Sequence, residues 1–231
     1  MVSFIMSHEN KYTPAIPRIS KSLRKQINQN NNSRIRFLSY KEAEILLDTL
    51  KMSSISLYEK TLISLHCGLR ASEIFQLTWS QVDVEHGILN IIDSKGSDRS
   101  VYMSGPVKQI FKIKTHGKQN ALVFPGRNKK ASVQISNTFQ KIADKLFNKD
   151  ITDSRQKVVF HTCRHTAASW MVMKGVSLYV VQKVLGHSTI QVTERYSHLA
   201  PDQLKLAANA IDTVVLQNKE KNVVAFKKKA S

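Results

Sequence analysis

The sequence HTCRHTAASWMVMKGVSLYVVQKVLGHSTIQVTERY, residues 161–196, combines apolar runs of helical length with two glycines that divide them. The apolar run Ala167–Met173 predicts a first helix that ends at Gly175, because glycine readily adopts the left-handed conformation that closes a helix. Residues 178–185 predict a second helix that ends at Gly186 in the same way. The stretch therefore predicts a group of short helices with polar side chains at the breaks between them.

Four of those polar side chains have chemistry in common. His161 and Arg164 are three residues apart at the head of the first helix, a spacing that places both on one helix face. His187 directly follows the second helix-ending glycine. Residues 188–191 begin with serine and end with glutamine, the capping-box pattern of a third helix that carries Tyr196 near its end. One phosphate group could therefore be approached by a guanidinium, two imidazoles and a phenol.

An upstream segment, CGLRASEIFQLTW at residues 67–79, adds a second arginine. A helix over residues 58–67 is predicted to end at Gly68, and Arg70 stands at the beginning of the next helix. Glu73 follows three residues later, close enough to hold the Arg70 guanidinium. Taken alone, this pair is interpreted as an ordinary surface salt bridge, because such pairs are common and weak. Taken with the downstream stretch, it is interpreted as part of a functional site.

The segments CGLRASEIFQLTW, HTCRHTAASWMVMKG and LGHSTIQVTERYSHL, in this order, resemble the three signature boxes of the tyrosine recombinases, the phage-integrase-like site-specific DNA recombinases. The resemblance covers residues 37–217 and implies a mainly α-helical catalytic domain with a small antiparallel β-sheet, an α+β fold. Cys163 stands where many relatives carry leucine, a tolerable apolar exchange. The resemblance implies a catalytic set, with Glu73 and His165 in supporting roles; the set is Arg70, Lys95, His161, Arg164, His187 and Tyr196.

The sheet is predicted between the first two boxes. Residues 82–84, 88–92 and 101–103 are short runs with the alternation and β-branching of strands. The turn DSKGSDR lies between the last two, and relatives carry a catalytic lysine on a hairpin at this place, so the resemblance implies that role for Lys95. Lys95 is preferred to Arg99 because a lysine can give up a proton and an arginine effectively cannot.

Phosphodiester cleavage explains the residue types in this set. Two guanidinium groups, Arg70 and Arg164, can stabilise the charge that accumulates on the nonbridging oxygens without a metal ion. Tyr196 would be the nucleophile, and its phenol needs a base and cationic surroundings at neutral pH. His161 is the candidate base, Lys95 the candidate acid for the departing 5′ oxygen, and His187 a hydrogen-bond partner of the phosphate. The resemblance implies a 3′-phosphotyrosyl link that a 5′-hydroxyl can resolve without ATP, and no cofactor.

The charge of the chain points to nucleic acid. Lysine and arginine number 35 against 17 carboxylates, a formal charge of +18, and such a surface attracts polyanions, nucleic acid first and acidic membrane second. The resemblance implies double-stranded DNA. Residues 1–36 predict a basic arm or interdomain linker in which cations displace the counterions of a DNA backbone. A solvated tail is the alternative for each of the candidate DNA-binding cations of this arm, which are Lys11, Arg18, Lys21, Arg24, Lys25, Arg34 and Arg36.

The end of the chain suggests assembly. A predicted helix over residues 202–217 carries more apolar side chains than it needs for itself, and the corresponding helix of relatives often packs on a neighbouring protomer. We therefore expect a homo-oligomer, a tetramer on DNA and a monomer in isolation, with a DNA-bending accessory protein as a further partner. Residues 218–231 are interpreted as a basic disordered tail. Relatives usually carry a separate helical domain before the catalytic one, so the chain is either a catalytic fragment or a short recombinase resembling the invertases.

Several alternatives are open. A topoisomerase of type IB uses the same groups to relax DNA, and a DNA-binding remnant would not react at all. Zinc binding by His161, Cys163, His165 and His187 is disfavoured, because no glutamate follows His161 as a base and the arginines and Tyr196 stay unexplained. Two cysteines far apart in sequence, no secretory signal and no apolar run of membrane length favour a bacterial or phage-encoded protein of the cytoplasm.

Overall fold

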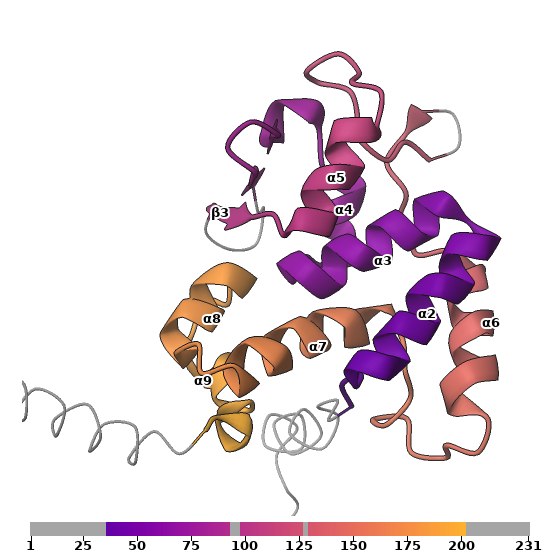
Figure 1. Cartoon of the computed structure of the whole chain (residues 1–231), viewed down its shortest axis with the longest axis vertical. Coiled ribbons are helices and arrows are strands. Elements are labelled where there is room, and N and C mark those ends of the chain that lie inside the picture. Colours follow the sequence, from indigo (N-terminus) through magenta and orange to yellow (C-terminus); the bar gives the residue numbers. More distant parts are fainter. Residues whose placement is uncertain (1–35, 93–97, 127–128, 202–231) are drawn as a thin grey trace, which may run out of the picture.

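The computed structural model describes residues 36–92, 98–126 and 129–201, which form a mainly helical fold with a small sheet at one edge (Figure 1). Helix α3 (Ile55–Cys67) lies at the centre and packs against α2 (Tyr40–Ser53), α4 (Ala71–Gln76), α5 (Gly105–Ile113) and α7 (Phe160–Met173). Its leucines, with Ile63 and Cys67, are buried in the main hydrophobic core. The predicted mainly α-helical fold with a small antiparallel sheet is confirmed.

The N-terminal helices begin where side chains cap them. Ser39 accepts a hydrogen bond from the backbone of Glu42, and the Glu42 carboxylate accepts one from the backbone of Ser39 at 2.8 Å, so the start of α2 has a complete capping box. Ser54 caps α3 and starts it at Ile55, three residues before the predicted beginning. At its other end α3 stops at Gly68, whose φ of 67° is the left-handed conformation expected there.

The sheet has three antiparallel strands in the order β1 (Val82–Asp83), β2 (Ile88–Ile91) and β3 (Arg99–Tyr102). Leu89 pairs with Val101, and both side chains are buried against the core, so the alternation of the two strands sets the register. The predicted strands are therefore confirmed, with the last one beginning two residues earlier than expected. A 3₁₀ turn, η1 (Trp79–Gln81), leads into the sheet.

Helical segments before α7 fix the point at which α7 begins. Helix α6 (Asn137–Ala143) continues into a π-helical turn, η3 (Asp144–Asn148), which ends near the start of α7. The Asn148 side chain accepts from the backbone of Val158 at 2.7 Å and donates to its carbonyl at 2.9 Å. This pair of bonds fixes the segment that precedes α7 and hence the position of His161 in its first turn.

The C-terminal elements form a second, smaller apolar cluster. Helix α8 (Leu178–Leu185) lies beside β3, and α9 (Gln191–Glu194) with the 3₁₀ turn η4 (Ser197–Leu199) follows it (Figure 1). The buried members of this cluster come from α7, α8 and the turn before η4; they are Ala168, Val172, Val181, Leu185 and Tyr196. Helix α8 ends at Gly186 with a φ of 65°, as predicted.

The predicted third helix over residues 189–196 is wrong in its extent. Helix α9 has only four residues, and Ile190, not Ser188, stands at its N-cap without a side-chain cap bond. The turn that closes α8 takes the backbone N–H of His187 to Gln182, and the first helical bond is from Thr193 to the carbonyl of Ile190. Tyr196 therefore lies in the turn between α9 and η4 and not on a regular helix.

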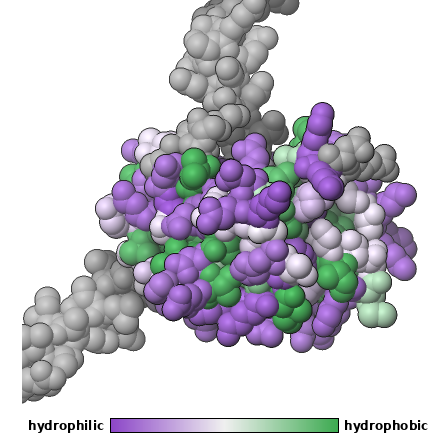
Figure 2. Space-filling view, turned by 90° about the horizontal axis from the view of Figure 1, so that it is seen from above, coloured by the Kyte–Doolittle hydropathy of each residue, from purple (hydrophilic) through white to green (hydrophobic). Residues whose placement is uncertain are grey.

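The surface mixes polar and apolar side chains. On the face seen from above, hydrophilic residues dominate and hydrophobic ones stand between them (Figure 2). The most exposed large apolar side chains include Met52, Tyr102 and Ile113. Within the described ranges, no helix has the length and apolarity that crossing a membrane requires.

Candidate active site

Glu73 is a buried carboxylate at the start of α4, and its side chain is 4% exposed. It accepts a hydrogen bond of 2.7 Å from the backbone N–H of Arg70 and another of 2.7 Å from Arg70 Nη1. Arg70 Nη2 also donates to the carbonyl of Gly186 at 3.2 Å, while the Arg70 side chain is 32% exposed. The predicted pair is confirmed, and because its carboxylate is buried it is not an ordinary surface salt bridge.

A second arginine shares the same carboxylate. Arg99, the first residue of β3, binds Glu73 with both terminal nitrogens, Nη2 to Oε2 at 2.9 Å and Nη1 to Oε1 at 3.1 Å. Its Nε donates to the carbonyl of Val184 in α8 at 2.8 Å, and its side chain is 6% exposed. No sequence prediction covers this contact of Arg99. No local spacing could have revealed it, since the two residues are 26 positions apart.

Arg164, in α7, links the ends of two other helices. Its Nη1 donates to the carbonyl of Gly68 at 2.7 Å and its Nη2 to that of Leu185 at 2.6 Å. These carbonyls lie at the C-terminal ends of α3 and α8, where helical backbone acceptors have no partner in the helix and the dipole favours a cation. Burial and the neighbouring Arg70 lower the pKa of Arg164 to about 9, which leaves the guanidinium charged at neutral pH. Arg164 Nη1 is 3.8 Å from Glu73 Oε2.

His187 is held next to this cationic group by a threonine. Its Nδ1 lies 2.9 Å from the hydroxyl oxygen of Thr193, which is fully buried, and Gln182 donates to its carbonyl. Burial, with the nearby Arg164 and Arg70, lowers the pKa of His187 to about 3. The imidazole is therefore neutral at physiological pH. Thr193 is a second positioning residue that the sequence analysis missed.

Tyr196 is 6% exposed, and its hydroxyl lies 2.5 Å from Nδ1 of His165. Burial raises the pKa of Tyr196 to about 12, against the opposing effect of Arg195 and Arg164. The His165 ring packs edge-on against that of His161, with centroids 4.7 Å apart. The predicted supporting residue His165 therefore makes the direct contact with the phenol, and the predicted base His161 lies one ring further away.

His161 and Arg164 differ in environment despite their predicted common face. His161 is exposed in the first turn of α7, whereas the Arg164 side chain is 3% exposed. A spacing of three residues turns the second side chain by about 60° around the helix axis, enough to separate solvent from core at the edge of a buried stripe.

Some predicted residues lie outside the described ranges. Lys95 falls in the gap at 93–97, and the predicted helix 202–217 and tail 218–231 follow the last described residue. Of the arm cations, only Arg36 is described, where it forms an ion pair with Glu42 and donates to the carbonyl of Phe37 at 2.8 Å. The other arm cations lie outside the described residues: Lys11, Arg18, Lys21, Arg24, Lys25 and Arg34.

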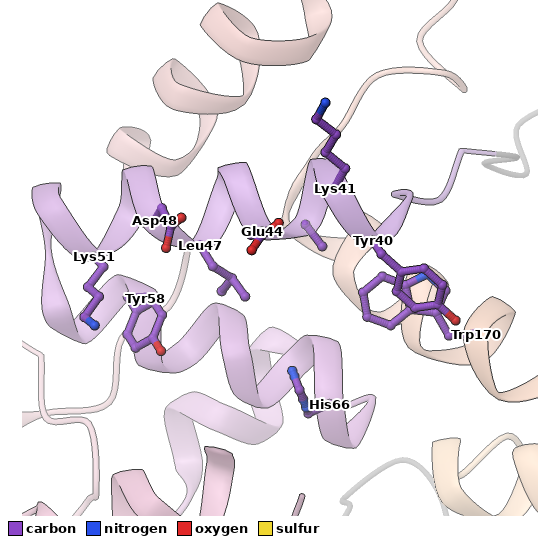
Figure 3. A pocket seen from close by; sticks show the side chains of 10 residues that line it. Tyr40, Lys41, Glu44, Leu47, Asp48, Lys51, Tyr58, His66 and Trp170 are labelled. Atoms are coloured by element: carbon purple, nitrogen blue, oxygen red, sulfur yellow. The ribbon is translucent and has the colours of Figure 1, made fainter. Parts of the chain in front are cut away.

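Two further features lie apart from this cluster. A groove of about 860 Å³ between α2 and α3 has Trp170 of α7 at one end, packed against Tyr40 with ring centroids 4.7 Å apart and ring planes tilted by 32° (Figure 3). None of the predicted site residues lines it. In the described part of the chain, no three His, Cys, Asp or Glu side chains are grouped as a metal site would need, and Cys163 of the zinc hypothesis is fully buried.

Comparison with known proteins identifies the class to which this fold and site belong. The profile of the phage integrase family matches residues 36–203, and the chain belongs to this family. The integrase of Salmonella phage P22 is 30% identical over 200 residues, which are 82% of this chain and 50% of that protein. A tyrosine recombinase of Thermosipho africanus is 33% identical over 175 residues, 74% of this chain and 60% of that protein. The chain thus spans about half or slightly more of the length of these relatives.

Solved structures agree on the fold. The catalytic domain of bacteriophage HP1 integrase superimposes with a TM-score of 0.58 and 25% identity, covering 76% of this chain and 95% of that domain. The Tn1549 transposon integrase, solved in complex with circular intermediate DNA, gives a TM-score of 0.61 at 21% identity over 76% of this chain and 66% of that one. The fold is that of tyrosine recombinase catalytic domains, and the resemblance stated from the sequence is confirmed.

Proposed function

We propose that this chain is the catalytic part of a site-specific DNA recombinase or integrase, which cleaves and rejoins double-stranded DNA through a 3′-phosphotyrosyl intermediate. The observation that carries the proposal is the cationic cluster around Glu73, with a phenol close to it. Three guanidinium groups contact or approach one buried carboxylate, which leaves two net positive charges, and one of the three, Arg164, also acts on Tyr196. Integrase and recombinase relatives support the same conclusion.

The cluster suits the transition state of phosphodiester cleavage. As the phenol oxygen attacks, a phosphate with one negative charge becomes a pentacoordinate species with two. Two fixed net positive charges in a partly buried site stabilise the doubly charged transition state more than the singly charged substrate. This difference lowers the barrier of the reaction. Arg70 is the more exposed of the predicted arginines, with its side chain 32% exposed, while the Arg164 guanidinium binds the carbonyls of Gly68 and Leu185.

His187 acts as a neutral hydrogen-bond donor to the phosphate in this proposal. Its low pKa keeps the ring uncharged. When the Thr193 hydroxyl donates to Nδ1, the ring proton resides on Nε2, the nitrogen left to bind a nonbridging oxygen. His187 therefore adds no charge to the site at neutral pH, and the charge of the three arginines does not vary across that range.

Tyr196 is the nucleophile and His161 the base in this proposal. In the structure the phenol bonds to His165, so its proton either passes to that ring or is taken by His161 after the hydroxyl changes partner. Attack by the phenol oxygen on phosphorus forms the phosphotyrosine bond and breaks the bond to the 5′ oxygen, which takes a proton from Lys95. The reverse sequence, with a 5′-hydroxyl as nucleophile, restores the diester, so neither a metal nor ATP enters the balance.

The partners follow from the same proposal. Double-stranded DNA is the substrate, and the charge of +18 favours binding along its backbone, with the basic arm 1–36 as one contributor. The catalytic domain spans residues 37–217, and the helix 202–217 would dock on a second copy in a tetramer on DNA, with a DNA-bending protein as an accessory. Related proteins have been crystallised on DNA, including the XerH recombinase bound to its difH substrate.

Covalent trapping tests the proposal. The protein and its Tyr196→Phe variant are incubated with nicked suicide duplexes in the presence of a chelator, and a denaturation-resistant adduct is sought. We expect an adduct with the tyrosine protein alone. DNA binding without an adduct on any duplex would contradict catalysis and favour a binding remnant. Relaxation of supercoiled plasmid without strand exchange between two sites would favour a topoisomerase.

A further inference from the structure

Arg99 belongs to the cationic cluster around Glu73, but none of the proposed chemical steps uses it. Its guanidinium makes three contacts that join three elements: two to Glu73 of α4 and one to Val184 of α8, from the first residue of β3. With 6% exposure its side chain is nearly as buried as that of Arg164 at 3%. All three nitrogens of its guanidinium are engaged by Glu73 and Val184, so Arg99 holds other groups of the site.

The contacts define what Arg99 can do. Because its two terminal nitrogens bind both oxygens of Glu73, the plane of that carboxylate is fixed. Arg70 Nη1 binds the same Oε1 at 2.7 Å. The orientation of the Arg70 guanidinium therefore depends on how Arg99 holds the Glu73 carboxylate. The orientation of the exposed arginine is therefore set by the buried one.

The same guanidinium also lies against the turn before His187. An added Cβ on Gly186 would stand 2.7 Å from Arg99 Nη1, so the Gly186 backbone and the guanidinium are in close contact. Gly186 in turn offers its carbonyl to Arg70 Nη2. Arg99 thus supports from one side the turn whose other side carries His187.

Arg99 also sets the charge of the cluster. Without its guanidinium, the Glu73 carboxylate would cancel one of the two charges of Arg70 and Arg164, and one net positive charge would remain. A site with two net charges is matched to a dianionic transition state, and a site with one is matched to the singly charged substrate. Lysine would keep the charge but not the fork, since an ammonium cannot bind both carboxylate oxygens and Val184 in the same plane.

We propose that Arg99 is a positioning residue of the cleavage reaction, which orients Arg70 through Glu73 and supplies the charge that makes the cluster selective for the transition state. This inference rests on the proposed function. It concerns a residue outside the proposed catalytic set.

The test compares Arg99→Gln and Arg99→Lys with Arg155→Gln, which removes the same charge from an exposed ion pair with Asp153. Single-turnover cleavage of a saturating nicked duplex is measured beside the dissociation constant for that duplex. We expect Arg99→Gln to cleave about 100-fold more slowly, the loss typical of a misplaced catalytic group. Its dissociation constant should stay within about threefold of that of Arg155→Gln, because Arg99 does not contact the DNA.

A second substrate separates charge from fold. An uncharged methylphosphonate at the scissile position removes one negative charge from substrate and transition state, so the missing charge of Arg99→Gln should matter much less there. We expect its deficit to fall at least tenfold on this substrate. Arg99→Lys, which keeps the charge, should be slower by the same factor on both substrates. Equal deficits of Arg99→Gln on both substrates would overturn the inference that Arg99 supplies charge to the transition state.

The remaining outcomes are also decisive. Cleavage by Arg99→Gln at the rate of Arg155→Gln would overturn the inference while the wild-type adduct keeps the proposed function intact. Absence of any wild-type adduct would instead defeat the proposed function itself. If thermal melting shows that Arg99→Gln is unfolded, Arg99→Lys decides alone: reduced cleavage with unchanged binding supports the positioning role, and a wild-type rate overturns it.

Discussion

Glu73 contacts two arginines directly and approaches a third, so its carboxylate offsets repulsion within the cluster. Burial alone would raise the pKa of Glu73, but the hydrogen bonds from Arg99 and the charges around it hold the pKa below its ordinary value. The carboxylate is therefore ionised at neutral pH. Its negative charge is present to hold the site together rather than to react.

Replacing Glu73 by glutamine should destabilise the protein by about 3 kcal/mol, because it leaves buried guanidinium groups without a counter-charge. The difference should be full at neutral pH and shrink as the pH falls below the ordinary carboxyl range, where the wild-type Glu73 is protonated too. Urea unfolding of both proteins at two pH values measures it. Glu44→Gln, at an exposed position of α2, is the control and should change stability by less than about 0.5 kcal/mol.

His187 should also make the stability of the protein depend on pH, beginning at a higher pH than Glu73 does. Its folded pKa of about 3 lies below the ordinary value of 6.5, so the unfolded chain takes up a proton first as the pH falls. Stability from this group is complete above about pH 6.5 and is lost as the pH falls toward 3. Between about pH 7.5 and pH 5, the urea midpoint of the wild type should therefore fall more than that of His187→Asn. Parallel curves for the two proteins would show that the ring is not neutral in the fold.

At the scale of elements, the site is built from helix ends. Helices α3 and α8 both stop at left-handed glycines, and Arg164 binds a carbonyl at each of these ends. The residues after those glycines include Arg70 and His187, so the same turns that end the helices place the polar groups. The chemistry of the site depends on where α3 and α8 stop.

Gly186→Ala should lower cleavage as well as stability. Alanine at a φ of 65° is strained by about 1–2 kcal/mol, and its Cβ would meet Arg99 at 2.7 Å. Gly175→Ala is the matched control, since that glycine also has a positive φ, of 82°, but an added Cβ meets nothing within 4 Å. We expect both variants to melt at lower temperature and only Gly186→Ala to cleave nicked duplex more slowly at a temperature where both are folded. Equal cleavage rates of the two variants would show that the turn at Gly186 does not affect the reaction.

The sequence predicts those parts of the fold that depend on neighbours along the chain. The Ser39 capping box, the glycine ends of α3 and α8 and the pair of Arg70 with Glu73 are all set by residues within a few positions of each other, and all are confirmed. The capping box from Ser188 is wrong, because helix α9 begins only at Gln191 with Ile190 as its N-cap. The contact of Arg99 with Glu73 depends on how β3 packs on α4, and no local pattern encodes it.

At the scale of the whole molecule, charge should dominate DNA binding. The formal charge of +18 includes the six arm cations that precede Arg36. If each one displaces a condensed counterion, replacing all six by glutamine should lower the slope of log affinity against log salt by about 5. Fluorescence anisotropy with a duplex at several salt concentrations measures the slope. An unchanged slope would show that the arm does not lie along the DNA, and replacing the five lysines of residues 219–229 gives a control of similar charge.

We expect the two apolar clusters of the protein to open as separate cooperative units, with the cationic cluster around Glu73 at their junction. The small cluster of α7, α8 and Tyr196 is separate from the main core, and like charges meet near the junction. Because few apolar side chains hold this unit, it should open at a lower free energy than the rest of the protein. An anion bound at the cationic cluster relieves the repulsion among its arginines and is released when the smaller apolar cluster opens. It therefore stabilises the closed form by mass action. Under the proposed function a DNA phosphate would be a structural ligand as well as a substrate, and amide protons of residues 178–199 should exchange more slowly once it binds.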